Sequence, residues 1–304
     1  MAKLGRPCHA KDIAEAAGMK ERYVREWLGA MVTGRIVEFD TSDETYVLPS
    51  HRIEVLCRQR GDGSEAVVSE AVPAICEVYS DILKCMEIDG PKGLPYSRYN
   101  LFSKWLELKE ETRADFTPSK YLSEVNEVKQ ILGLSTLVCE IGCSSGTGLC
   151  RLATDYPNPR YYGIDISQSA IKTAKSLAET ANLSNVTFSC TDTTRLQDDW
   201  EAKFDVVYCM DVVHDVPRPD ILLKEIHRIL KKGGFFIMVD INGHTKLADN
   251  MALPFASVNY MFSLFACMPM SLYADGWGLG SMWGQEKAFE MLTNAHFECL
   301  SISD

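Results

Sequence analysis

The chain has 304 residues, a formal net charge of −11 and 46% hydrophobic residues, so it can bury the cores of two domains. The net negative charge argues against a nucleic-acid-binding protein. Such proteins gain most of their affinity by neutralising phosphates with a basic surface. The eleven cysteines form no paired metal-binding pattern and no secretory signal peptide is recognised, so we expect reduced thiols in a cytoplasmic protein without a metal site.

Residues 1–60 have the order of a winged helix, which is a short helix, a longer helix and a hairpin. In residues 8–19, Ile13, Ala16 and Ala17 are expected on one buried face, with Gly18 ending the helix. In residues 20–35 the expected inner positions are Val24, Trp27, Leu28 and Met31. Ten basic and nine acidic residues balance in this module, so it offers no basic face to DNA.

A helical linker is predicted over residues 61–135. Residues 64–86 and 100–114 have helical spacing, and the loop-like stretches GDGS and DGPKGLP flank the first of these helices. The candidates for a lid over a ligand are Tyr96, Tyr99, Phe102 and Trp105.

The stretch LVCEIGCSSGTG, residues 137–148, predicts a buried parallel strand, a tight turn and the start of a helix. Glycines there let the backbone adopt unusual dihedral angles and let a ligand approach closely. The dinucleotide pattern G-x-G-x-x-G fails, because counting from Gly142 places Ser144 and Thr147 at its other two glycines. A phosphate loop is also excluded, because it would end in a lysine that this stretch lacks.

Two more predicted strands end at acids. Residues 161–167 place Asp165 at the end of a strand, at the spacing of a carboxylate that accepts from both ribose hydroxyls. Ser167 is better placed than Asp165 to cap the next helix. Residues 186–194 place Asp192 at the end of the next strand. An aspartate there could also do no more than stabilise the turn that follows the strand.

Residues 204–216 predict a central strand, followed by a helix over 219–234 with Lys231 and Lys232 at its negative end. Gly233 and Gly234 are expected to stop that helix, before a fifth strand over 235–241 and a sixth over 297–304. The alternation predicts an α/β fold with a doubly wound, mostly parallel, Rossmann-like sheet. Ligands bind beyond the carboxyl ends of such strands, where the acids are Glu140, Asp165, Asp192, Asp211 and Asp240.

The loop of residues 140–146 resembles motif I of S-adenosylmethionine (SAM) dependent methyltransferases, E/D-x-G-x-G-x-G, with Ser144 at the middle glycine. From residue 136 onward the chain resembles a class I methyltransferase, which implies SAM as the cofactor. The resemblance places the methionine end of SAM among Glu140, Gly142, Ser144 and Gly146. It implies further cofactor contacts at Asp165, Ile166, Asp192, Thr193, Met210 and Asp211.

The string RYVREWLGAMV, residues 22–32, resembles a helix of a methyltransferase family with an N-terminal winged-helix domain. The implied domains are a winged helix at 1–60, a linker or lid at 61–135 and a methyltransferase domain at 136–304. In several methyltransferase families this module is a dimer interface, so we expect a homodimer that binds no nucleic acid. The resemblance also implies that the winged helix lacks its first helix and the methyltransferase domain its last strand.

His214 in VVHDVPRPD resembles the His-Asp segment of winged-helix O-methyltransferases, where the histidine is the catalytic base. The resemblance implies the same role here, with Asp215 or Asp211 orienting the ring. An alternative is a His-Asp turn that only begins a helix. A magnesium site at Asp211, Asp240 and Asn242 is disfavoured, because Ile241 separates the last two, and no metal is predicted.

Residues 251–272 are nearly long enough to span a bilayer, but Pro254, Asn259 and Pro269 interrupt them. We therefore expect no membrane span, and instead an insertion after the fifth strand that covers the active site. The aromatic residues of 271–284 are candidates for an apolar acceptor pocket, or for core or dimer packing.

Together these features predict an enzyme that transfers a methyl group from SAM to a small-molecule acceptor, most simply at oxygen. The alternatives are a winged-helix regulator that senses SAM, and a SAM-binding protein without catalytic activity.

Overall fold

The computed structural model describes residues 1–57, 69–112 and 118–303. The chain divides into two compact units. Within the described residues, the first unit comprises residues 1–57, 69–70 and 111–112, and the second comprises residues 71–110 and 118–303. Each unit has a hydrophobic core of its own.

The first unit is a winged helix, as the sequence predicts. Its helices are α1 (Ala10–Ala17), α2 (Glu21–Thr33) and α3 (Ser50–Leu56), and its antiparallel hairpin is β1 (Glu38–Asp40) with β2 (Thr45–Val47). A bridge between Cys8 and Tyr46 adds a third, single-residue partner to the hairpin. Gly18 ends α1 in the left-handed conformation that glycine adopts without strain.

Three of the expected inner residues of the winged helix are exposed instead. Ala16 and Ala17 are exposed, and the buried face of α1 consists of Ala10, Ile13 and Ala14 instead. Trp27 is 48% exposed and Tyr23 is 74% exposed. On α2 the buried stripe is Val24 and Leu28, four residues apart, so Tyr23 and Trp27 share a neighbouring apolar face.

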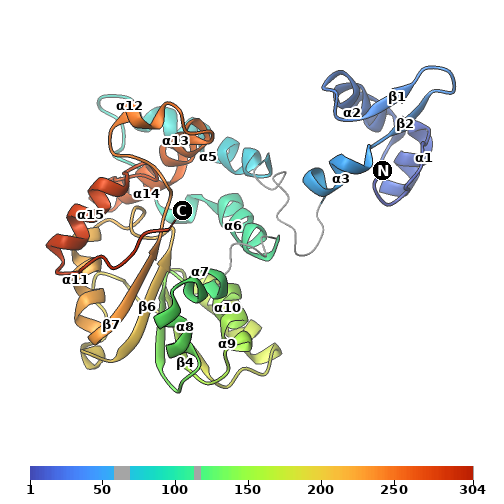
Figure 1. Ribbon diagram of the computed structural model, residues 1–304. Helices are drawn as coiled ribbons and strands as arrows, with labels where there is room; N and C mark the ends of the chain where they lie inside the picture. Colours follow the sequence, from blue (N-terminus) through green and yellow to red (C-terminus); the bar gives the residue numbers. More distant parts are fainter. Residues whose placement is uncertain (58–68, 113–117, 304) are drawn as a thin grey trace. The chain divides into compact units, whose positions relative to one another are not determined.

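The second unit is built on a five-stranded parallel sheet, which confirms the predicted fold (Figure 1). The strand order is β5-β4-β3-β6-β7. The strands are β5 (Val186–Cys190), β4 (Arg160–Asp165), β3 (Leu137–Ile141), β6 (Phe204–Met210) and β7 (Leu230–Val239). Alternate residues of β3 face opposite cores, with Val138 on one side and Cys139 and Ile141 on the other.

Helices cover both faces of the sheet, so the unit has three layers. One core contains buried residues of α7 (Pro118–Glu124), α8 (Asn126–Leu132), α9 (Thr147–Asp155) and α10 (Gln168–Thr180). The opposite core contains buried residues of α11 (Pro219–Ile229) and α15 (Gln285–Asn294). This double winding brings the carboxyl ends of all five strands to one edge.

Two sequence expectations about the end of the sheet are wrong. The helix α11 ends at Ile229, and Lys231, Lys232 and both glycines lie in β7. Lys231 donates to both carboxylate oxygens of Asp205 at the start of β6, which holds it on the sheet. The expected sixth strand is not formed through residue 303, because residues 298–303 are exposed and pair with no strand, so β7 stays the last strand of the sheet.

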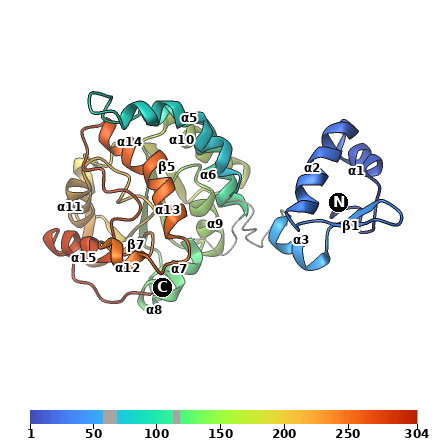
Figure 2. The same ribbon diagram turned by 90° about the horizontal axis from the view of Figure 1, so that it is seen from above.

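The short η2 (Asp198–Trp200) precedes β6, and the other helices gather above the carboxyl edge of the sheet (Figures 1 and 2). Two come from before the sheet, α5 (Ala71–Cys85) and α6 (Asn100–Thr112), with the short η1 (Tyr96–Arg98) between them. The insertion after β7 supplies α12 (Leu247–Asn250), α13 (Ala256–Phe262), the π-helix η3 (Ser263–Cys267) and α14 (Met268–Tyr273). In the part of the chain that the structure describes, no helix combines the length and apolarity needed to cross a bilayer.

Candidate active site

The loop after β3 is shaped by three residues with positive φ. Gly142 and Gly146 have φ of 73° and 75°, and Ser144 between them has φ of 48°. A Cβ at Gly142 would lie 2.5 Å from Cγ2 of Val212, and one at Gly146 would lie 2.7 Å from the Cβ of Ala174. Backbone conformation and close packing therefore both require glycine at these two positions.

Asp165 at the end of β4 ties this loop to the next helix. Its Oδ2 accepts from the amide of Ser144 at 2.9 Å, and its Oδ1 accepts from the amide of Ser167 at 2.8 Å. Burial raises the pKa of Asp165, and the backbone hydrogen bonds partly oppose that rise. Ser167 caps α10 by accepting from Ala170, so capping does not need Asp165.

Glu140 is a buried carboxylate near the end of the central strand, where it is 6% exposed. It pairs in register with Gly163 of β4 on one side and Tyr208 of β6 on the other. Burial and the charge of Glu140 raise the pKa of Tyr208 well above its ordinary value. Glu140 and Asp165 thus come from adjacent strands at the edge where the glycine loop begins.

The other predicted cofactor residues occupy the ends of β4, β5 and β6. Ile166 is 65% exposed, as an apolar side chain that faces a ligand would be. Oδ1 of Asp192 accepts from the amide and the hydroxyl of Thr194 and so stabilises the turn after β5. Thr193 lies in the same turn. Met210 ends β6 half-buried, and Asp211 follows it with φ of 54°.

His214 lies behind these ends and is 3% exposed. Its Nδ1 is 2.7 Å from Oδ1 of Asp240, and its Nε2 is 3.2 Å from Oδ1 of Asp215. Oδ1 of Asp240 also accepts from the indole of Trp283 at 3.2 Å and from the amide of Ile241 at 2.8 Å. Because an ionised carboxylate only accepts, Nδ1 donates to Asp240, so the proton that the ring gains or loses is the one on Nε2.

The electrostatics of His214 oppose its burial. Burial alone would lower the pKa of the ring, but the nearby carboxylates of Asp215 and Asp240 raise it well above its ordinary value. Burial raises the pKa of Asp215, which His214 partly offsets. Sequence reasoning considered Asp215 and Asp211 as the orienting group and missed Asp240. Its position directly after β7, beside the end of β6, was the available signal.

Apolar side chains of α5, α6 and the insertion form a closed apolar contact region, packed so tightly that no water-sized space is left. Its residues are Ala74, Ile75, Val78, Tyr99, Phe102, Phe262, Phe265 and Ala266. Trp105 stacks on Phe262 with ring centroids 5.0 Å apart. Of the four lid candidates, Tyr99, Phe102 and Trp105 are buried, whereas Tyr96 is 44% exposed. The aromatic helices before and after the sheet therefore meet over the same edge.

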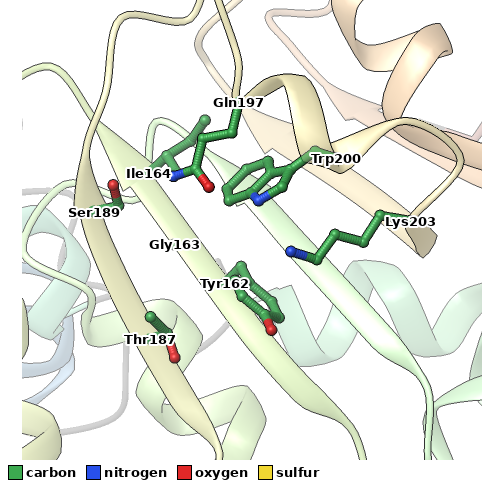
Figure 3. Close-up of a pocket in the computed structure, with 8 residues that line it drawn as sticks. All are labelled: Tyr162, Gly163, Ile164, Thr187, Ser189, Gln197, Trp200 and Lys203. Atoms are coloured by element: carbon green, nitrogen blue, oxygen red, sulfur yellow. The ribbon is translucent and has the colours of Figure 1, made fainter.

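A separate cavity of about 120 Å³ lies against β4 and β5 (Figure 3). Tyr162, Thr187 and Ser189 contribute side chains from the strands, and Trp200 and Lys203 close it from the following turn. The Nζ of Lys203 lies 4.9 Å from the Tyr162 ring and 5.0 Å from the Trp200 ring. None of the predicted site residues lines this cavity, so it is separate from the candidate active site.

Two family models match the chain. One, described as "Methyltransferase domain", matches residues 135–295. The other, described as "Rv2258c-like winged HTH domain", matches residues 1–58. These ranges correspond to the parallel-sheet unit from β3 onward and to the winged helix.

Among curated proteins, the chain is 33% identical over 109 residues to the ubiquinone biosynthesis O-methyltransferase of Coxiella burnetii, covering 36% of this chain and 45% of that protein. It is 28% identical over 155 residues to the fatty-acid O-methyltransferase of Mycolicibacterium smegmatis, covering 51% of this chain and 50% of that protein. The chain thus spans about half the length of these curated relatives.

Solved structures share the fold over nearly the whole chain. Human N-acetylserotonin methyltransferase in complex with SAM aligns with a TM-score of 0.66 and 15% identity, covering 98% of this chain and 84% of that one. An O-methyltransferase family protein from Burkholderia thailandensis aligns with a TM-score of 0.60 and 13% identity, covering 96% and 83%. At these identities the likeness concerns the fold alone.

Proposed function

The chain belongs to the methyltransferase domain family, and we propose that it transfers the methyl group of SAM to an oxygen atom of a small-molecule acceptor. SAM supplies a methyl group already activated by a sulfonium. The main support for oxygen as the methyl-accepting atom is the buried His214, whose Nδ1 lies 2.7 Å from Oδ1 of Asp240. A hydroxyl acceptor gains from a base at this position, because its proton must leave as the new bond forms.

The proposed SAM site combines a tightly turned glycine loop with carboxylates at the ends of adjacent strands. Gly142 and Gly146 turn the backbone with positive φ, and their Cβ positions are filled by neighbouring side chains, so the loop is fixed tightly at the end of β3. The carboxylates of Glu140 and Asp165 lie at the ends of adjacent strands beside this loop. We assign the methionine end to Glu140, Gly142, Ser144 and Gly146. We assign the nucleoside end to Asp165, Ile166, Asp192, Thr193, Met210 and Asp211.

Packing connects the base to the donor loop. Val212 is the side chain closest to the Cβ position of Gly142, at 2.5 Å, and His214 is two residues further along the chain. Asp240 holds the Nδ1 proton, so once the ring has lost its Nε2 proton it can accept the proton of the acceptor hydroxyl at Nε2. The carboxylates of Asp215 and Asp240 then stabilise the protonated ring.

The acceptor side favours a molecule with an apolar or aromatic body. Phe265 and Ala266 belong to the apolar contact region, which would have to open to admit an acceptor, and the next residue, Cys267, lies beside His214 and Asp215. An acceptor that places its hydroxyl on His214 therefore extends along aromatic side chains. Water is kept from the reacting atoms by the same buried helices.

The winged helix serves as a homodimer interface in this proposal, rather than as a reader of nucleic acid. Exposed Met19, Tyr23 and Trp27 give it an apolar surface. On α2, ion pairs of Arg25 with Glu21 and of Arg22 with Glu26 neutralise the cations that phosphates would need.

Two measurements on the full chain test this function. Calorimetric titration should show binding of SAM and of its demethylated product. Incubation with labelled SAM and panels of phenols, aliphatic alcohols, carboxylic acids, amines and thiols should then label oxygen acceptors, and His214→Gln should lose that labelling while still binding SAM. Binding without product would favour the sensor or the inactive binding protein. Labelling of amines or thiols alone would contradict transfer to oxygen.

A further inference from the structure

Three potential metal ligands of different chemistry meet beside the proposed base. Ligand atoms of His214, Asp215 and Cys267 all lie within 4.8 Å of one another. The first two residues follow β6, whereas Cys267 ends the π-helix η3 of the insertion. His214 and Cys267 are 3% and 6% exposed, so the cluster is buried except at the side chain of Asp215.

The set of an imidazole, a carboxylate and a thiolate suits a soft or borderline divalent cation such as Zn²⁺. Three protein ligands leave one position of a tetrahedral ion open, as in catalytic rather than structural zinc sites. Bonds of about 2.0–2.3 Å hold tetrahedral ligands roughly 3.5 Å apart. Closing the cluster on an ion therefore asks for side-chain movements on the order of 1 Å.

The outer contacts of His214 match those of a metal-binding histidine. Such a histidine donates its second ring N–H to a carboxylate or carbonyl, which fixes the orientation of the ring and leaves the other nitrogen facing the ion. Here Nδ1 is 2.7 Å from Asp240, and Asp240 is itself held by the indole of Trp283 and the amide of Ile241. Nε2 is thereby turned to the side of Asp215, from which it is 3.2 Å away.

The backbone that presents Cys267 is also unusual. Residues Ser263–Cys267 form a π-helix between two α-helical segments, α13 and α14. Wide turns of this kind inside helices are frequently found at functional sites. Here the π-helix ends at Cys267, so this local backbone conformation places the cysteine beside His214 and Asp215.

We propose that His214, Asp215 and Cys267 bind one soft divalent cation of the Zn²⁺ class, and that the bound ion blocks methyl transfer. The second clause rests on the proposed function, because an ion on Nε2 of His214 occupies the lone pair that would accept the acceptor's proton. The site then acts as a metal-sensitive inhibition site within the active centre.

Cobalt titration of the purified full chain, without SAM, tests the site directly. Co²⁺ should bind with one equivalent that shows thiolate-to-metal charge-transfer absorption, and Zn²⁺ should displace it. Cys267→Ser should remove the charge-transfer absorption and weaken binding at least about tenfold, because a neutral hydroxyl replaces the thiolate. Cys150→Ser is the matched control, since Cys150 is also helical and 5% exposed but packs in the core beneath α9, outside the cluster, and it should bind as the wild type does.

Two outcomes would overturn the site: no saturable equivalent with that absorption in the wild type, or the same absorption in Cys267→Ser. If Cys267→Ser fails to fold by circular dichroism, Asp215→Asn replaces it, because that side chain is 34% exposed and its loss is less costly to the core. Asp215→Asn should likewise weaken binding at least about tenfold, and unchanged binding would contradict the assignment.

Activity then tests the inhibition separately. With an acceptor identified as above, an equivalent of Zn²⁺ should suppress transfer and a chelator should restore it, while Cys267→Ser should resist the ion. Full turnover by the zinc-loaded wild type would overturn the inhibition. A chain that binds cobalt as described but labels no acceptor supports the site and contradicts the proposed function.

Discussion

The glycine loop after β3 and the cluster around His214 lie at the same edge of one sheet, yet they are built by different means. Backbone conformation shapes the loop, with positive φ at Gly142, Ser144 and Gly146 within five consecutive residues. Side chains from distant segments shape the cluster, since His214, Asp240 and Trp283 come together only through folding. Substitutions in the glycine loop, the donor half of the site, should therefore act through backbone strain. Substitutions around His214, the acceptor half, should act through the loss of single polar groups.

The largest expected effect is on the acceptor half. His214→Ala should lower kcat/KM for an oxygen acceptor by about 10²–10⁴-fold, the range for loss of a general base. SAM affinity, measured by calorimetry, should stay near the wild-type value because the glycine loop is untouched. Normal turnover by the variant would mean that another group takes the proton.

Asp240→Asn should have the next largest effect, roughly 10²-fold on kcat. The asparagine amide can donate to Nδ1, which would place the ring proton on Nε2 and leave no lone pair for the acceptor. Trp283→Phe removes one donor to Asp240 and should cost about tenfold, the lower end of the range for a hydrogen bond to a charged group, because the Ile241 amide still donates to the same oxygen. Steady-state kinetics compare the two, and a larger loss in Trp283→Phe would reverse the assigned roles.

Gly142→Ala breaks the donor half instead. The left-handed backbone should cost roughly 1–2 kcal/mol in free energy of unfolding. The clash with Val212 should also lower SAM affinity about tenfold, which corresponds to 1.4 kcal/mol. Gly18→Ala is the control, because its φ is 63° but an added Cβ meets nothing within 4 Å. It should lose stability in denaturant melts without losing SAM affinity.

The double variant Gly142→Ala with Val212→Ala sharpens this test. Removing the Val212 side chain relieves the collision but not the backbone strain, so SAM affinity should recover more than stability does. Equal recovery of both would show that strain and collision are not separable at this position.

SAM affinity should depend on pH through Asp165. Burial raises the pKa of this carboxyl, and the charged form is the one that accepts from hydroxyls, so affinity should fall as pH falls toward the raised pKa. The decline should begin above the ordinary aspartate value of about 3.9. Asp165→Asn should bind weakly with little pH dependence. A wild-type affinity that is flat down to pH 4 would remove Asp165 from the ligand site.

The smallest effects are expected in the winged helix. Trp27→Lys should weaken self-association in sedimentation velocity while the free energy of unfolding changes by only about 0.5 kcal/mol, as for a surface position. Leu134→Lys, at a 60% exposed position of the other unit, is the matched control and should leave association unchanged. A monomeric wild type at micromolar concentration would remove the interface proposal.

The sequence by itself determined the sheet, the winged helix and the donor loop, because their signals are local. Alternating strands and helices dictate a parallel sheet, and the strand-ending acids Glu140 and Asp165 necessarily share an edge. The sequence-based predictions were wrong about the burial of Trp27 and about where α11 ends. At these points burial and strand pairing depend on neighbours from elsewhere in the chain.

Only the tertiary structure decided which groups surround His214. Asp240, Trp283 and Cys267 lie 26 to 69 residues further along the chain, and no short motif connects them with the histidine. Asp215 next in sequence is the obvious partner, yet Nδ1 lies against Asp240 because β6 and β7 are neighbours in the sheet. Side-chain partners across a sheet depend on strand order and on the path of insertions, and residue spacing does not encode these directly.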